Sequence, residues 1–186
     1  MRIISGKLKG KTIQFLKSSN TRPLKDSVKE NIFNILTHSN KIDVNIENSS
    51  VLDLYSGIGS FGLECISRKA KKVTFVENNP IAINILRKNL SFLSSVKKAI
   101  IKNDTIENIL QSQIKNQFQI FFLDPPFADN KYIFNLHLIK EKKIYSKNHV
   151  VIIHREKNSK DKIDDLISTI LIKNYGRSKI IFGKFN

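Results

Sequence analysis

The chain has 186 residues, of which 40% are hydrophobic and 9% aromatic; this composition excludes a disordered protein and fits one domain with a substantial core. No apolar stretch approaches the roughly 20 residues of a membrane helix, and the N-terminus turns basic too early for a signal peptide, so we expect no membrane partner. The single cysteine indicates a reducing cytoplasm. The net charge of +16 favours a polyanionic partner, although the excess of lysine over arginine indicates a contribution from genome-wide composition. Cys65 is the sole cysteine, which excludes an internal disulfide, and we expect it in the core.

The N-terminal part of the chain is predicted to form a small basic unit. Residues 2–15 read as two short strands separated by glycine-containing turns, which predicts a β-hairpin. A turn at 21–23 precedes a predicted helix over 26–38, for which Asp26 or Ser27 is the candidate cap. The apolar face expected for this helix consists of Val28, Ile32, Ile35 and Leu36.

A polar segment over 40–50 marks the expected boundary between a basic extension, residues 1–40, and a main domain, residues 41–186. From residue 51 onward, short apolar runs alternate with amphipathic stretches, which is typical of an α/β fold with a mostly parallel sheet covered on both faces. The expected strands cover 51–55, 73–77, 99–101, 120–123, 150–153 and 178–185. The expected helices cover 60–68 and 79–93, the second with Asn79 as its cap, Pro80 at its first position and an apolar face of Ile81, Ile85, Leu86, Leu90 and Leu93.

The tetrapeptide Asp124-Pro125-Pro126-Phe127 follows the apolar run 118–123. Its two prolines fix two φ angles and remove two N–H donors, so we expect the carbonyls of Asp124 and Pro125 to remain free as acceptors. Such acceptors suit a planar amino group, on which the Phe127 ring can stack; this is the arrangement needed to methylate an exocyclic base nitrogen. The alternative is a simple strand stop, because aspartate before proline is common in turns.

Gly57, Gly59 and Gly62 spell G-x-G-x-x-G at the turn from the first main-domain strand into its helix. These glycines permit a tight turn and let a ligand approach the backbone closely. Glu77 closes the second strand, where its carboxylate can accept both ribose hydroxyls of a nucleoside. Asp53 lies four residues before Gly57, where an anion disfavours a pyrophosphate and favours a cationic amino acid moiety. The alternative for Asp53 is a brace hydrogen-bonded to loop N–H groups.

Asp104 follows the strand expected at 99–101. Its position suits a hydrogen bond to the amino group of adenine. The alternative is a helix N-cap for residues 105–111, and the sequence favours neither.

In their order and spacing, these motifs resemble those of class I S-adenosylmethionine-dependent methyltransferases. Within that class, the chain resembles the RsmD family of bacterial small-subunit rRNA guanine-N2 methyltransferases. The resemblance extends to the N-terminus and is weaker after residue 130. In the N-terminal part of the chain, the resemblance is carried by residues 1–11, by Thr21-Arg22-Pro23, and by Asp26, Val28, Lys29, Glu30 and Phe33-Asn34.

The resemblance implies a Rossmann-like, seven-stranded sheet whose last strand is antiparallel, with the basic extension contacting 16S rRNA in a small ribosomal subunit or its assembly intermediate. It implies S-adenosylmethionine as cofactor, no metal, and a monomer. The implied cofactor-binding residues are Asp53, Tyr55, Ser56, Gly57, Gly59, Glu77, Asn78, Asp104 and Thr105. The implied catalytic residues are Asp124, Pro125, Pro126 and Phe127, and the implied RNA contacts are Arg2, Lys7, Lys9, Lys11, Arg22 and Lys29.

Two positions depart from the family pattern. The loop 55–59 replaces a more usual Phe-Ala-Gly-Ser-Gly sequence conservatively, and Lys29 stands where arginine is usual, which removes a bidentate contact. Arg22 is alternatively a residue that closes the pocket over the cofactor. The histidines share no metal-ligand spacing, and we expect them to be structural or surface residues; they are His38, His137, His149 and His154.

Three other functions remain open at this point. A methyltransferase acting on adenine N6 or on a glutamine side chain would usually carry Asn in place of Asp124. A nicotinamide oxidoreductase fits the glycine motif but not Asp53. A non-catalytic RNA-binding assembly factor would keep the fold and the charge.

Overall fold

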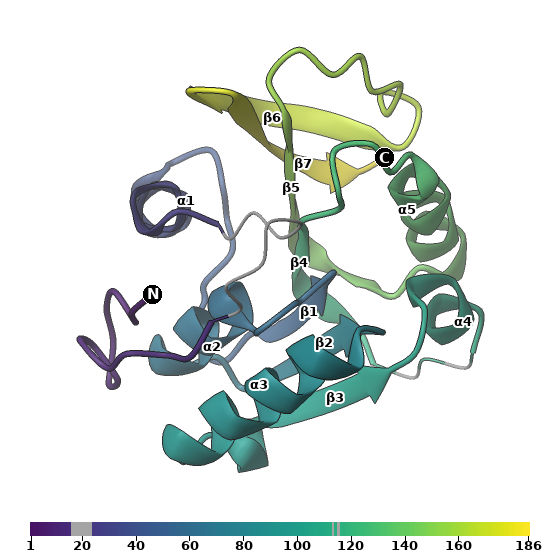
Figure 1. Cartoon of the computed structure of the whole chain (residues 1–186). Helices are drawn as coiled ribbons and strands as arrows, with labels where there is room; N and C mark the ends of the chain where they lie inside the picture. Colours follow the sequence, from purple (N-terminus) through teal and green to yellow (C-terminus); the bar gives the residue numbers. More distant parts are fainter. Residues whose placement is uncertain (16–23, 113, 115) are drawn as a thin grey trace.

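In the computed structural model, which describes residues 1–15, 24–112, 114 and 116–186, a seven-stranded sheet has helices on both faces (Figure 1). The strand order is β3-β2-β1-β4-β5-β7-β6, and β7 runs in the opposite direction to the other six strands. The strands are β1 (Ser50–Leu54), β2 (Lys72–Glu77), β3 (Ala99–Asn103), β4 (Phe118–Leu123), β5 (Tyr145–Glu156), β6 (Ile167–Tyr175) and β7 (Ser178–Phe185). The helices are α1 (Asp26–His38), α2 (Ser60–Ser67), α3 (Pro80–Phe92), α4 (Ile106–Gln111) and α5 (Lys131–Lys142), with a short 3-10 turn, η1 (Val96–Lys98).

The predicted parallel sheet and its antiparallel last strand are confirmed. The sequence pattern did not predict β6 or α5. β6 is an edge strand that pairs with β7 only, and most of its residues are at least partly exposed. An edge strand need not carry a continuous apolar run, so its signal is weak.

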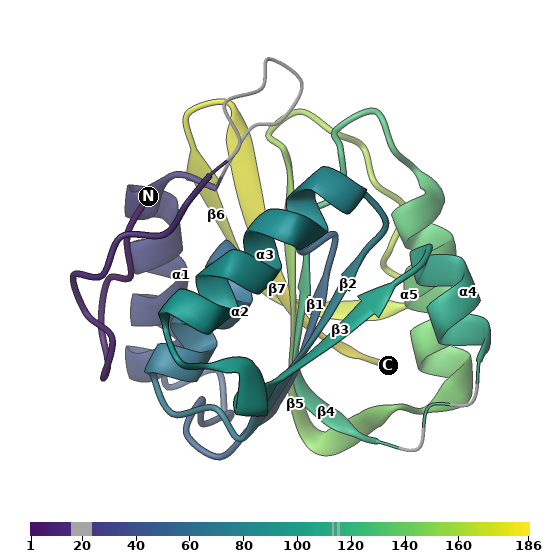
Figure 2. The ribbon, with the colours of Figure 1, turned by 60° about the horizontal axis from the view of Figure 1, so that its bottom comes forward.

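Side chains of successive strand residues enter two separate cores, one on each face of the sheet. Helices α1, α2 and α3 cover one face and α4 and α5 cover the other (Figure 2). Phe122 points into the first core and its neighbour Phe121 into the second, because side chains alternate along a strand. Cys65 is buried in the first core, as predicted. Among the described residues, no helix is long and apolar enough to cross a membrane.

The helix starts differ in part from those predicted. Asn79 caps α3 as expected: its side chain accepts hydrogen bonds from the backbone N–H groups of Ile81 and Ala82. Placing Ile81 on the buried face was wrong, because its side chain is 61% exposed in the first turn, and Ala82 and Ile83 are buried instead. The N-cap of α1 is Lys25, without a side-chain cap, so neither predicted cap residue has that role.

The predicted N-terminal hairpin is present in a short form: an antiparallel bridge joins Arg2 to Thr12, and Ile3 N donates to the Lys11 carbonyl at 2.9 Å and Ile13 N to the Met1 carbonyl at 3.1 Å. Helix α2 holds this segment against the main domain: the Glu64 carboxylate accepts hydrogen bonds from Ile4 N at 2.7 Å and Ser5 N at 2.9 Å. Ile3 and Ile13 belong to the same hydrophobic core as β1 and α2. Residues 1–15 therefore have no core of their own and fold as part of the main domain.

Candidate active site

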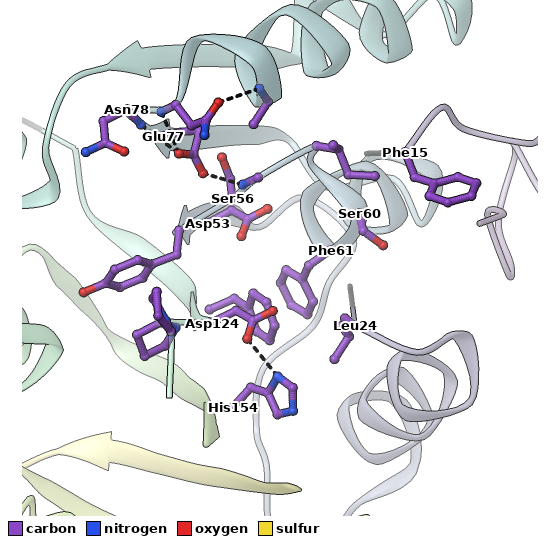
Figure 3. A pocket seen from close by; sticks show the side chains of 18 of the residues that line it. Phe15, Leu24, Asp53, Ser56, Ser60, Phe61, Glu77, Asn78, Asp124 and His154 are labelled. Atoms are coloured by element: carbon purple, nitrogen blue, oxygen red, sulfur yellow. Dashed lines mark hydrogen bonds and ion pairs between the residues drawn. The ribbon is translucent and has the colours of Figure 1, made fainter. Parts of the chain in front are cut away.

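A cavity of about 500 Å³ opens where the carboxyl ends of four adjacent strands, β2, β1, β4 and β5, meet. This volume is typical of a small-molecule site, and strand carboxyl ends are the usual place for one in an open α/β sheet. Figure 3 shows Glu77, Asp53, Asp124 and His154, one from each strand or strand end, around this space. The N-terminal segment completes the wall with Met1, Phe15 and Leu24. Among the predicted site residues, the lining includes Asp53, Tyr55, Ser56, Gly57, Glu77, Asn78, Asp124, Pro125, Pro126 and Phe127.

The glycine loop after β1 adopts left-handed backbone conformations where the chain turns away from the sheet. Gly57 has a φ of 53° and Gly59 a φ of 84°. A methyl group at Gly59 would lie 2.4 Å from the Leu86 side chain of α3, whereas one at Gly57 would meet nothing within 4 Å. Gly59 therefore permits close packing of the loop on α3, and Gly57 leaves open space on the cavity side.

We expect Gly59→Ala to lower the free energy of unfolding by about 2 kcal/mol, from the strained φ and from overpacking against Leu86. Gly57→Ala is the matched control: it meets the same backbone strain without the steric conflict, and should cost about 1 kcal/mol. Urea unfolding followed by circular dichroism measures both. Equal losses in the two variants would contradict the assigned packing role of Gly59.

Asp53 is 1% exposed and its Oδ2 atom accepts a hydrogen bond from Gly62 N at 3.0 Å. This contact is the loop brace foreseen as an alternative, and Asp53 also lines the cavity. Burial raises the pKa of Asp53 well above its usual value, and the nearby carboxylates of Asp124 and Glu77 act in the same direction. A cation bound in the cavity would relieve this cost, because it would favour the ionised carboxylate.

Glu77 accepts hydrogen bonds from the backbone N–H groups of Gly57, Asn78 and Asn79, at 2.8, 3.0 and 2.8 Å. It therefore ties the glycine loop to the connection between β2 and α3. A carboxylate has about four acceptor positions, so Glu77 keeps capacity for a ligand hydroxyl.

Asp104 and Thr105 are not among the residues that line the cavity. The cap of α4 is Thr105, whose hydroxyl accepts a hydrogen bond from Asn108 N at 3.2 Å, so the cap role considered for Asp104 was wrong. Asp104 is exposed, and its Oδ1 atom accepts hydrogen bonds from Thr105 N and the Asn108 side chain. The adenine contact of Asp104 stays a prediction.

A side chain of β5 holds the Asp124 tetrapeptide in place through its backbone carbonyls. Arg155, 1% exposed, donates from Nη1 to the Pro126 carbonyl and from Nη2 to the Phe127 carbonyl, each at 3.1 Å. Asp161 and the ring of Tyr132 fix the guanidinium in turn. Arg155 thus makes this turn rigid, a role that sequence reasoning missed.

Asp124 and Pro125 of the tetrapeptide line the cavity. Among the described residues, no donor contacts the Pro125 carbonyl, as expected from the prolines. The Asp124 side chain makes a contact that the sequence did not predict: its Oδ1 atom lies 2.8 Å from Nδ1 of His154. Because an ionised carboxylate only accepts, this contact places the proton of a neutral His154 on Nδ1. Oδ2 of Asp124 remains available for another donor.

His154 was expected to be a structural or surface residue, and the structure shows that it is buried and hydrogen-bonded to Asp124. Its side chain lines the cavity and packs edge-on against Phe127, with ring centroids 5.7 Å apart. The signal was present in the sequence, because His154 follows an apolar run in β5 just as Asp124 follows one in β4. In register, the two side chains stand next to each other on neighbouring parallel strands.

Lys29, predicted to contact RNA, is fully buried in α1. Its ammonium donates to the Arg2 carbonyl at 2.9 Å and to the Ser60 hydroxyl at 3.2 Å, and lies 3.7 Å from Asp26. Burial lowers its pKa. The prediction was wrong for this residue, which joins α1 to the N-terminal segment and to α2.

The other predicted RNA contacts lie on the surface where the structure describes them. Arg22 falls outside the described residues. The exposed ones are Arg2, Lys7, Lys9 and Lys11.

Comparisons with known proteins by family model, sequence and structure agree with one another. The family model described as Conserved hypothetical protein 95 matches residues 1–184. Ribosomal RNA small subunit methyltransferase D of Haemophilus influenzae is 36% identical over 160 residues, covering 85% of this chain and 80% of that protein. The protein of the same name from Buchnera aphidicola subsp. Acyrthosiphon pisum is 33% identical over 155 residues, covering 83% and 78%. A solved structure of yhhF, a provisionally assigned methyltransferase of Escherichia coli, has a TM-score of 0.85 at 25% identity and covers 100% of this chain and 98% of that one.

Proposed function

Because the chain belongs to the RsmD family, whose model is described as Conserved hypothetical protein 95, we propose that it transfers a methyl group from S-adenosylmethionine to N2 of a guanine in small-subunit rRNA. The observation that carries this proposal is one cavity that holds both the glycine loop and the acceptors Asp124 and Pro125. The related proteins are named as small-subunit rRNA methyltransferases, which supports rRNA as the substrate class.

The cavity fits S-adenosylmethionine by the chemistry of its donors and acceptors. Asp53 is a buried carboxylate that would pair with the ammonium of the amino acid moiety, and Glu77 would accept from the ribose hydroxyls. The space beside Gly57 admits a ligand close to the loop backbone. The bound sulfonium supplies an already activated methyl group, so the protein need provide no covalent intermediate.

The task of the protein is then to hold and orient a weakly nucleophilic amine. The Oδ2 atom of Asp124 and the Pro125 carbonyl would accept its hydrogen bonds and disperse the positive charge that develops on nitrogen. His154 is a positioning residue in this scheme, because its Nδ1–H fixes the Asp124 carboxylate through Oδ1. Phe127 would stack on the base. The proton leaves to Asp124 or to water.

The target base must leave its stack to reach this cavity, as in single-strand RNA recognition and base flipping. We propose that exposed basic residues of the N-terminal segment hold the surrounding RNA by phosphate contacts. We also propose that a monomer acts in the cytoplasm, on a small subunit or its assembly intermediate. The segment's candidate contacts are Arg2, Lys7, Lys9 and Lys11.

The test is methyl transfer from labelled S-adenosylmethionine to small subunits from cells that lack this gene, followed by separation of nucleosides. N2-methylguanosine is the expected product. Methylated adenosine, or label in protein instead of RNA, would overturn the proposed target. Cofactor binding without turnover on any subunit preparation would favour a non-catalytic assembly factor.

The raised pKa of Asp53 makes the cofactor proposal testable by pH. Because a ligand ammonium prefers the ionised carboxylate, affinity for S-adenosylhomocysteine should increase as pH rises through the Asp53 pKa. Asp53→Asn should bind about tenfold more weakly at the high-pH end and lose this part of the pH dependence, since a hydrogen bond to a charged group contributes about 1.5–3 kcal/mol. Isothermal titration calorimetry measures both, with exposed Asp164→Asn as control. An identical pH profile in Asp53→Asn would contradict the pairing.

A further inference from the structure

A second cavity, of about 440 Å³, lies beside the first. It is enclosed by the beginning of α1 and by the turn between β6 and β7, two parts of the chain that lie on the same side of the molecule (Figure 1). His154 lines both cavities and is the side chain that they share. The residues that line the second cavity are Lys25, Ser27, Val28, His154, Tyr175, Gly176, Arg177 and Ser178.

The charges that line this second cavity are of one sign, positive. Lys25 and Arg177 are exposed on two different walls, and the lining contains no carboxylate. Within the described residues neither cation forms an ion pair, and the sequence of residues 16–23, next to Lys25, contains no acidic residue. Asp26 is the nearest carboxylate in the sequence, and it lies beside the buried Lys29. The cavity therefore has two free cations that suit a phosphodiester.

The cavity also has groups that suit the rest of a nucleotide. Tyr175 is half-buried, packs on the first core and lines the cavity. Its ring can stack on a base. The Nε2 atom of His154 is buried without a hydrogen-bond partner among the described residues, and it points away from Asp124 (Figure 3). With the proton on Nδ1, Nε2 is an acceptor that a ribose hydroxyl would satisfy.

We propose that the second cavity binds the nucleotide next to the target guanosine in the RNA strand, with Lys25 and Arg177 on its phosphates and Tyr175 stacked on its base. This inference rests on the proposed function, because it assigns the first cavity to the target base. The shared side chain of His154 would then separate two consecutive nucleotides. The one-sided positive charge favours RNA over a peptide as the occupant.

The main test is the double variant Lys25→Ala/Arg177→Ala. Its matched control is Arg87→Ala/Lys88→Ala, which removes the same two residue types from the exposed face of α3. For the test variant we expect KM for rRNA to rise about tenfold or more, kcat to stay within about twofold, and S-adenosylhomocysteine affinity to be unchanged. The slope of log affinity against log salt should fall by about 1–2, as expected for two lost phosphate contacts. The control should change KM and slope far less.

Tyr175 gives an independent measurement. Tyr175→Phe keeps the ring and should keep KM, whereas Tyr175→Leu keeps apolar packing, loses stacking, and should raise KM about fivefold or more. The inference would be overturned by equal KM values for Tyr175→Leu and the wild type, or by equal effects of the test and control double variants. Methyl transfer to rRNA by the wild type would still support the proposed function in that case. If wild-type protein methylated no RNA, the proposed function would fail first. RNA-oligonucleotide binding by fluorescence anisotropy would then decide whether the second cavity binds RNA at all.

Discussion

Replacing Asp124 with alanine should slow methyl transfer by about 100- to 1,000-fold, with S-adenosylhomocysteine affinity kept within a few-fold. The size of this effect follows from removing a fixed polar group at the point where charge develops in the transition state. The structure adds a second cost, because His154 Nδ1 would lose its partner at 2.8 Å. Single-turnover rates with saturating cofactor and rRNA measure the effect without interference from product release.

Asp124→Asn is the graded comparison, since its side chain keeps one carbonyl oxygen in the same shape, and we expect a smaller loss than for alanine. Asp165→Ala, an exposed carboxylate after β5, should leave the rate unchanged. A rate for Asp124→Ala above one tenth of the wild-type value, with the cofactor bound, would show that Asp124 does not hold the amine.

The second large effect concerns stability. Glu64→Ala should lower the free energy of unfolding by about 3 kcal/mol or more, because it leaves the Ile4 and Ser5 N–H groups and the Arg68 guanidinium without their buried acceptor. Glu64 is fully buried, so water does not replace it. Urea unfolding measures the loss, and limited proteolysis should cut first near residues 1–15.

Glu47→Ala is the matched control, since Glu47 forms an exposed ion pair with Lys69 at 3.0 Å. Pairs of this kind contribute at most about 1 kcal/mol. If Glu64→Ala lost no more stability than Glu47→Ala, the attachment of the N-terminal segment to α2 would be weaker than its geometry indicates.

The positions of the site residues could be predicted from the sequence wherever a polar residue interrupts or ends an apolar run. Asp53, Glu77 and Asp124 stand at or near the carboxyl ends of three parallel strands, and in such a sheet those ends meet. The same argument applies to His154, which stands at the same edge of the sheet, although the histidines were considered only as metal ligands. Arg155 could not be found in this way, since its partners are backbone carbonyls that only the folded turn brings to it.

The charge of Lys29 predicted an exposed side chain, but its position in the helical pattern agrees with burial. Its neighbours in the helical pattern, Val28, Ile32, Phe33 and Leu36, are all buried, and Lys29 lies on the same face. The helical period agrees with the burial of Lys29, whereas its RNA contact was inferred from the family resemblance without regard to this face. The N-terminal hairpin is shorter than predicted because its strands have no sheet to join, and bonds to α2 support its few pairing bonds.

The docking of the N-terminal segment has a consequence for synthesis on the ribosome. Ile4 bonds a side chain 60 positions later, and Gln14 bonds Asn89, 75 positions later. The segment is translated well before these partners, so its contacts with α2 and α3 form only after those helices have been synthesised. Contacts of such long range also slow folding, because a large loop closes before they form. Since Met1 and Phe15 line the first cavity together with Asp124 and His154, the nascent chain acquires a complete binding pocket only when the N-terminal segment has docked and β4 and β5 have been synthesised.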